Sequence, residues 1–215
     1  DTPARRRWQR GARQLPCARP LFHYTAGHQK RLNPERGIDP MLISKKMNAA
    51  INEQIGNEFA ASLQYVAIAC HFDTESLAEL AAHFYAQAQE ERDHAMRFVK
   101  YLVEAGGTVN IPAIAAPQSA FKTAEAAVQL SLASEKRVTA QINRLMELAI
   151  KESDHITQNM LAWFIREQLE EVSSMESLLK VVQRAGESNL IFVESHLARK
   201  HGKSGDAGGV EQTLA

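Results

Sequence analysis

The chain of 215 residues has only two cysteines, Cys17 and Cys70, and no apolar run that approaches the length needed to span a bilayer. Neither cysteine belongs to a CxxC pair, so the sequence favours neither a disulfide framework nor a cysteine metal site. Apolar residues make up 45% and charged residues 23% of the chain, which is typical of an ordinary globular protein. We therefore expect a protein of the reducing cytoplasm with no membrane segment.

The chain also lacks net charge, but its charges are unevenly distributed. Residues 1–40 hold nine Arg or Lys and three acids, whereas residues 41–215 hold sixteen Arg or Lys and twenty-two acids. An acidic body of this kind argues against a nucleic-acid-binding function.

Both ends of the chain lack the periodicity of a folded domain. Residues 1–42 are predicted to be a basic, disordered leader, because they contain prolines and clustered arginines and no sustained hydrophobic period. No apolar segment follows the basic start, so an export signal is not supported. Met41 could be the natural start, with the leader encoded upstream; the alternative is a basic arm that contacts nucleic acid. Residues 202–215 are predicted to be a flexible Gly-rich tail, with docking of 210–215 into a partner shell as the alternative.

Residues 43–201 show helical periodicity and predict an all-α domain. Gly106 and Gly107 are expected to stop the second helix, and Asp73-Thr74-Glu75 to supply the turn and cap before it. The segment 108–118 contains two prolines and no helical period, which predicts a crossover along the length of a bundle. Asp154 is expected to cap the fourth helix and Gly186 to close it. The predicted helices span 44–72, 75–105, 123–151, 154–185 and 188–200.

The predicted buried stripe of each long helix, taken at alternating spacings of four and three, is interrupted in the middle by a carboxylate or its amide analogue. The four interruptions are Glu58, Glu91, Glu135 and Gln168. The stripes are Ile51, Ile55, Glu58, Ser62, Tyr65, Ala69; Phe84, Ala88, Glu91, Ala95, Phe98, Leu102; Val128, Leu132, Glu135, Thr139, Ile142, Met146; and Leu161, Ile165, Gln168, Val172, Met175, Leu179.

A single Glu on an apolar face usually lies at the edge of that face and reaches water. Four such residues at matching positions are different, because an ionised carboxylate is costly to bury without a positive partner. No Lys or Arg lies on these stripes. A bound cation explains the pattern, and a purely structural bundle that binds no metal is the alternative.

The two halves of the helical region repeat with an offset of 77 residues, a multiple of seven that preserves the helical phase. Glu91 corresponds to Gln168, and His94, one turn later, corresponds to Glu171. Side chains at positions i and i+3 lie on one face of a helix, so each pair can chelate one metal. Oxygen ligands with a single imidazole favour iron or manganese over structural zinc. Tyr65 is expected to point toward the same interior, either as a core residue or as a redox-active or hydrogen-bonding neighbour of the metals.

Residues 44–200 resemble the non-haem bacterial ferritins. The resemblance is carried by Asn57-Glu58-Phe59, by Glu90-Glu91-x-x-His94, by Glu135, and by Trp163-Phe164-x-x-Glu167-Gln168-x-x-Glu171. It implies a ferritin-like antiparallel four-helix bundle with a long crossover between the second and third helices and a short fifth helix.

The resemblance also implies a set of metal-binding and catalytic residues. It places Glu58, Glu91 and His94 on a first iron, and Glu91, Glu135 and Glu171 on a second. Gln168 would complete the wall of that site, and Tyr65 would adjoin it. A third, weaker iron would bind at the positions that match the family's third site, which are Glu90, Glu167 and Glu170.

The function implied by the resemblance is iron storage with ferroxidase activity. Fe(II) would be oxidised by oxygen and deposited as Fe(III) mineral inside a cytoplasmic shell of twenty-four subunits, with residues 189–201 lining an axis. Arg92 occupies the position of the haem-ligating Met of bacterioferritins, so haem is not expected. Glu152 and Asp154 are the candidates for an ion pore. The alternative is a different di-metal enzyme on the same bundle, such as an oxygenase, which would need a substrate pocket and no shell.

Overall fold

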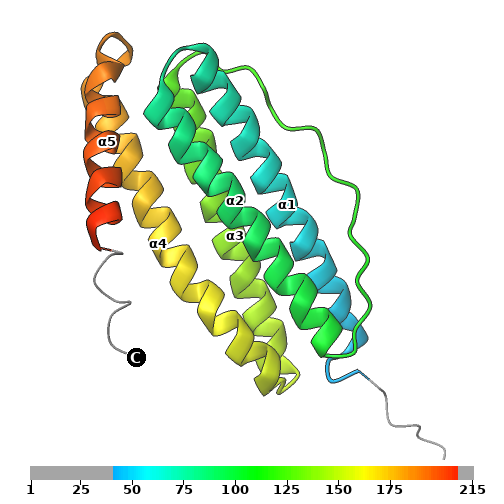
Figure 1. Ribbon diagram of the computed structural model, residues 1–215. Coiled ribbons are helices and arrows are strands. Elements are labelled where there is room, and N and C mark those ends of the chain that lie inside the picture. Colours follow the sequence, from blue (N-terminus) through cyan, green and yellow to red (C-terminus); the bar gives the residue numbers. More distant parts are fainter. Residues whose placement is uncertain (1–40, 208–215) are drawn as a thin grey trace, which may run out of the picture. The chain divides into compact units, whose positions relative to one another are not determined.

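The computed structural model describes residues 41–207, with side chains through Lys200. The predicted leader up to residue 40 and the predicted tail from residue 208 lie outside the described residues. The described part contains only helices and turns, which confirms the all-α prediction. The elements are α1 Lys45–Thr74, α2 Ala78–Glu104, α3 Ala124–Lys151, α4 His155–Ala185, the 3-10 helix η1 Glu187–Asn189, and α5 Leu190–Ala207 (Figure 1).

Helices α1 and α2 form one antiparallel pair, and α3 and α4 form the other (Figure 1). The segment between α2 and α3 runs beside α1 from one end of the bundle to the other, so the predicted crossover is confirmed. Asn52 Nδ2 donates to the Thr108 carbonyl at 2.8 Å near one end, and Gln64 Nε2 donates to the Gln118 carbonyl at 2.8 Å farther along. Between them Gly56 permits a close approach, because a Cβ at this position would collide with the ring of Pro112.

Three of the four long helices begin with a side-chain cap close to the predicted position. Ser44, Thr123 and Asp154 accept hydrogen bonds from backbone N–H groups three residues later, at 2.9, 3.0 and 2.9 Å. These bonds satisfy N–H groups that have no partner within the helix. Gly186, with φ of 68°, ends α4 as predicted.

The start of α2 differs from the prediction. The turn lies close to the predicted place, but α1 continues through Thr74. Leu77 occupies the N-cap position of α2 and makes no side-chain cap bond. The carboxylate of Glu194, on α5, accepts from Glu79 N at 2.8 Å and from Leu80 N at 2.9 Å instead. At the start of α3, the carboxylate oxygen Oε2 of Glu187 accepts a hydrogen bond from Ala124 N at 3.1 Å. A carboxylate suits these positions because helix N-termini carry a partial positive charge.

Helix α5 packs at the end of the bundle where α1 turns into α2, with Val193 and Leu197 buried against the core. It continues to Ala207, seven residues past the predicted end. Gly202 and Gly205 lie within it, since a glycine costs a helix only about 1 kcal/mol relative to alanine.

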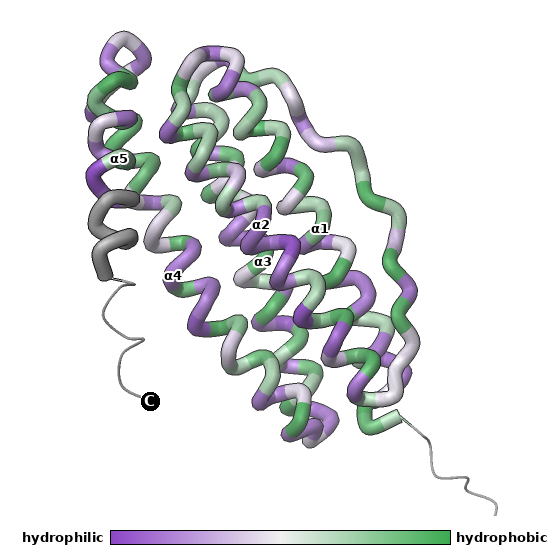
Figure 2. Tube along the Cα trace, in the orientation of Figure 1, coloured by the Kyte–Doolittle hydropathy of each residue, from purple (hydrophilic) through white to green (hydrophobic). Residues whose placement is uncertain are grey.

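The bundle core consists of two hydrophobic clusters with a polar layer between them. The first, near the α1–α2 turn, includes Phe72, Phe84 and Met175. The second, toward the other end, includes Met47 and Phe98. Figure 2 shows hydrophilic residues at the middle turns of α2 and α4, the level of this layer. Its buried polar residues are Glu58, Ser62, Glu91, His94, Glu135, Gln168 and Glu171.

The predicted stripes of α1 and α2 are entirely buried, whereas those of α3 and α4 are correct only at every seventh residue. In α4 the core-facing residues between these positions are Phe164 and Glu171, and Ile165 is 40% exposed. A stripe whose spacing alternates four then three residues and a stripe that alternates three then four coincide at every seventh residue. The apolar pattern of the sequence alone therefore did not determine which flank of the stripe faces the core. In α3 the correction replaces Leu132, Thr139 and Met146 with Ser131, Val138 and Leu145.

Among the residues that the structure describes, no helix is both long enough and apolar enough to cross a membrane.

Candidate metal centre

Four helices bring ionisable side chains to the middle of the bundle. The side chains of Glu58 on α1, Glu91 and His94 on α2, Glu135 on α3 and Glu171 on α4 are at most 6% exposed. The structure thus brings together in one layer the residues for which the sequence predicted an iron pair.

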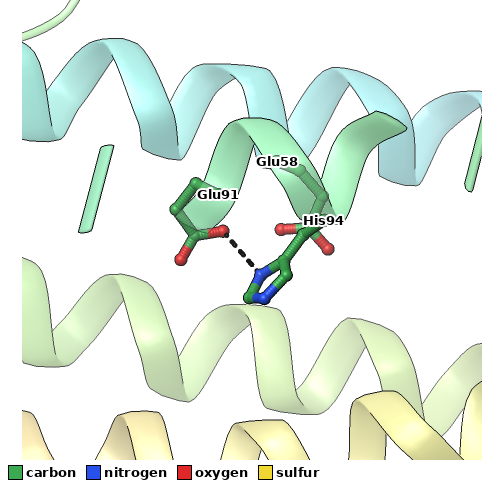
Figure 3. A group of neighbouring side chains, drawn as sticks. All are labelled: Glu58, Glu91 and His94. Atoms are coloured by element: carbon green, nitrogen blue, oxygen red, sulfur yellow. Dashed lines mark ion pairs between the residues drawn. The ribbon is translucent and has the colours of Figure 1, made fainter. Parts of the chain in front are cut away.

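Glu58, Glu91 and His94 form the first group, with one potential ligand atom of each within 4.8 Å of the others (Figure 3). His94 Nδ1 lies 3.4 Å from Glu91 Oε2, and the two atoms form no hydrogen bond. Glu58 Oε2 and Glu135 Oε2 are also buried without a hydrogen-bond partner. Buried polar atoms are normally paired, so this group of unpartnered ligand atoms fits a bound cation.

His94, Glu167 and Glu171 form a second group within the same 4.8 Å limit. Of the residues predicted for a third iron, Glu167 therefore lies against the buried centre. Glu90 is exposed at the surface, where Gln87 hydrogen-bonds to it, and Glu170 is exposed and joins neither group. The third iron site remains a prediction.

Uncharged side chains donate a hydrogen bond to one oxygen of Glu58 and to one oxygen of Glu135. Gln54 Nε2 donates to Glu58 Oε1 at 2.9 Å, and the Tyr65 hydroxyl donates to Glu135 Oε1. Gln168 lies at the same centre, where it opposes the rise in the pKa of Glu135, and its own Oε1 accepts from Thr139 Oγ1 at 2.8 Å.

The roles of Gln54 and Thr139 were not predicted from the sequence. Gln54 lies one turn before Glu58 on the same face of α1, and this spacing could have revealed it. Thr139 lay on the predicted stripe of α3, but its partner Gln168 is on α4, 29 residues away, and no local pattern indicates that contact.

Burial dominates the electrostatics of the centre. It raises the pKa of Glu58 well above the ordinary value, and the charge of Glu91 raises it further. Burial, followed by the charges of Glu135 and Glu171, likewise raises the pKa of Glu91. The pKa of Glu171 rises to about 8 because of burial and the neighbouring Glu135. The charged forms of these acids are therefore unfavourable unless a cation compensates them.

Aromatic rings close the centre on the α4 side. The rings of Trp163 and Phe164 meet the His94 ring edge-on, at centroid distances of 5.5 and 5.8 Å. The Arg97 guanidinium lies 3.8 Å from the centroid of the Trp163 ring, so this cation is stacked on an aromatic ring of the wall.

A bundle of four helices that surrounds one histidine with buried glutamates defines the class of carboxylate metal-binding bundles. Comparison with known proteins is more specific. A family profile described as "Ferritin-like domain" matches residues 48–185. The chain belongs to the ferritin family, and its relatives indicate a bacterial ferritin, as the resemblance implied.

Ferritin BfrB of Mycolicibacterium smegmatis is 45% identical over 163 residues, which cover 76% of this chain and 90% of the relative. Bacterial non-heme ferritin of Bacteroides fragilis is 30% identical over 159 residues, covering 74% of this chain and all (100%) of the relative. Among solved structures, an open pore ferritin from the hyperthermophilic archaeon Archaeoglobus fulgidus matches with a TM-score of 0.70 and 34% identity. That match covers 73% of this chain and 96% of the archaeal one.

Proposed function

We propose that this ferritin stores iron and is a ferroxidase, with Fe(II) and oxygen as its substrates. The observation that carries the proposal is the group of buried ligand atoms without a hydrogen bond, on Glu58, Glu91, His94 and Glu135, in the middle of the bundle. Family membership supports iron as the metal, and oxygen-rich ligands with one imidazole suit it.

Glu91 is the residue that joins the two halves of the proposed site. Its charge acts on Glu58 on one side, and the charges of Glu135 and Glu171 act on it from the other. A carboxylate in this position can bridge two Fe(II) ions, with Glu58 and His94 on one and Glu135 and Glu171 on the other. Two ions held together can supply two electrons to one oxygen molecule and become Fe(III).

The remaining parts of the proposal follow from the family. We propose a hollow shell of twenty-four subunits in the cytoplasm, a weaker third iron beside Glu167, and no haem. Arg92, at the position where a haem-binding relative would carry Met, is exposed on α2. The aromatic wall of Trp163 and Phe164 would exclude water from the His94 side of the centre.

Replacing Glu91 with Ala tests the proposal. The variant is expected to keep the helical fold and to lose rapid oxidation of Fe(II) in air, because neither ion retains its bridging ligand. Absorbance of Fe(III) after stopped-flow mixing measures the rate. Glu104→Ala is the matched control, since Glu104 is an exposed acid on the same helix and, within the described residues, forms an ion pair with Lys100 alone. Equal rates in the Glu91 variant and the unmodified protein would overturn the assignment.

Particle size and metal content distinguish the alternatives. A storage protein should elute as a very large hollow assembly that retains iron. A different di-metal enzyme would bind metal as a small oligomer, and a purely structural bundle would bind none.

A further inference from the structure

Gln54 is a buried amide at the edge of the metal centre. It lies on α1 one turn before Glu58 and is 2% exposed. Its Nε2 donates to Glu58 Oε1 at 2.9 Å, and Glu58 itself is fully buried. An uncharged amide buried against a carboxylate adds no charge to the site. It instead fixes the orientation of the carboxylate and occupies one of its oxygens.

Two neighbours fix the orientation of the Gln54 amide. Asn57 Nδ2 donates to Gln54 Oε1 at 3.4 Å, and Gln54 Nε2 lies 3.5 Å from Gln141 Oε1 on α3. If the amide rotated by half a turn, its oxygen would face both Glu58 and Gln141, and its NH2 group would face the donor on Asn57. The surroundings therefore keep the donor side of Gln54 toward Glu58.

We propose that Gln54 is a positioning residue of the metal centre, which holds Glu58 Oε1 so that Glu58 offers an ion the single oxygen Oε2. Glu58 Oε2 is buried and has no hydrogen-bond partner, as expected for an atom reserved for a ligand. A carboxylate held at one oxygen cannot easily chelate through both. It thereby leaves a coordination position on the ion open.

The same arrangement occurs across the centre on Glu135. The Tyr65 hydroxyl donates to Glu135 Oε1, and Glu135 Oε2 is left without a partner. Helix α1 thus supplies one neutral donor to Glu58, on its own helix, and one to Glu135, on α3. Two equivalent constraints on opposite sides support a shared purpose, which is to limit each acid to one metal-binding oxygen.

The other side of Gln54 lines a surface pocket of about 410 Å³ between α1 and α3, with Lys46, Glu53 and Arg144 also among its lining residues. Gln54 therefore lies between this pocket and the buried oxygen of Glu58. An apolar side chain of the same length would fill the same space and remove only the donor, which makes Gln54→Met the appropriate substitution.

Co(II), which does not react with oxygen at this kind of site on the assay timescale, is the probe for coordination. In Gln54→Met the freed Glu58 is expected to bind through both oxygens, so the visible absorption of bound Co(II) should weaken as its coordination number rises. Loss of a residue that orients a metal ligand typically lowers metal affinity or activity roughly 10–100-fold. We expect a change of this size in the Co(II) dissociation constant and in the rate of Fe(II) oxidation.

Gln64→Met is the matched control. Gln64 is also a glutamine on α1, but it bonds to the crossover at Gln118 and not to the centre. Its variant should lose some stability while the Co(II) spectrum stays unchanged. A Gln54→Met spectrum that matches the unmodified protein, or one that changes no more than the control, overturns the proposal.

Gln54→Glu provides a second variant of nearly the same shape if the methionine variant folds poorly. It replaces the amide donor with a carboxyl group, so it should also change the Co(II) spectrum; an unchanged spectrum counts against the proposal. The activity readout rests on the proposed function, whereas the spectrum does not. A protein that fails to oxidise Fe(II) but shows the Gln54 effect on Co(II) would refute ferroxidase activity and leave the positioning role standing.

Discussion

Glu171 illustrates at the scale of a single residue how the centre depends on a cation. Burial and the charge of Glu135 raise its pKa to about 8, so it carries a proton over much of the neutral range. The pKa of Glu58 is shifted in the same direction by burial and the charge of Glu91, and that of Glu91 by burial and the charges of Glu135 and Glu171. A metal ion competes with these protons, since a ligating carboxylate must be ionised.

Binding of Co(II) is therefore expected to release protons and to strengthen as pH rises from 6 to 8. Calorimetric titrations at pH 6.5 in two buffers of different ionisation enthalpy measure the protons released. Glu104→Gln should not change the result, because Glu104 is exposed and remote. An identical heat in both buffers would show that the acids are already ionised before the metal binds.

At the scale of the elements, the extent of each helix could largely be predicted because the signals are local. Ser44, Thr123, Asp154 and Gly186 mark helix ends through bonds that span a few residues. The carboxylate caps of α2 and α3 could not be predicted from the sequence. In the cap of α2, for example, Glu194 and Leu80 are 114 residues apart in the chain. Nothing near the start of α2 indicates that its cap is supplied by α5.

The candidate site shows the same division. Glu58, Glu91 and Gln168 were identified because a polar residue on an apolar stripe is conspicuous. The predicted stripes did not include Phe164 and Val138, which the structure buries, since only packing against the neighbouring helices selects one flank of a stripe. Hydrogen bonds between helices, such as Thr139 with Gln168, leave no periodic signal.

The cap from Glu194 provides a test at this scale. Glu194→Ala removes the carboxylate that accepts from Glu79 N and Leu80 N, and should cost about 1–2 kcal/mol of stability, with α5 loosened from the bundle. Hydrogen exchange of the amides in residues 190–200 measures the loosening.

Ser195→Ala is the control for that test, because Ser195 Oγ donates to the Ile191 carbonyl of its own helix and to no other group in the part of the chain that the structure describes. If exchange in α5 were as slow in the Glu194 variant as in the control, the carboxylate cap would not be what holds α5 to the bundle.

At the scale of the whole molecule, the raised pKa values predict how stability depends on pH. The native chain binds a proton at Glu171 between pH 4.5 and about 8, whereas the unfolded chain does not. The free energy of unfolding of the metal-free protein should therefore fall as pH rises through this window, by about 1.4 kcal/mol per pH unit for one such group.

Thermal unfolding of the metal-free protein at pH 6, 7 and 8 tests this dependence. Glu171→Gln removes one titrating group and should flatten the curve. Saturating Co(II) should raise the midpoint more at pH 8 than at pH 6. A variant whose curve is as steep as that of the unmodified protein would exclude Glu171 as a source of the pH dependence.

The layer of acids between two hydrophobic clusters also bears on the lifetime of the protein. In the proposed centre, each ion taken up would stabilise the folded state by mass action. Because proteases act on opened chains, a chain without metal would be the one more readily degraded. The acids of the proposed centre would thus link the persistence of the chain to whether it holds metal.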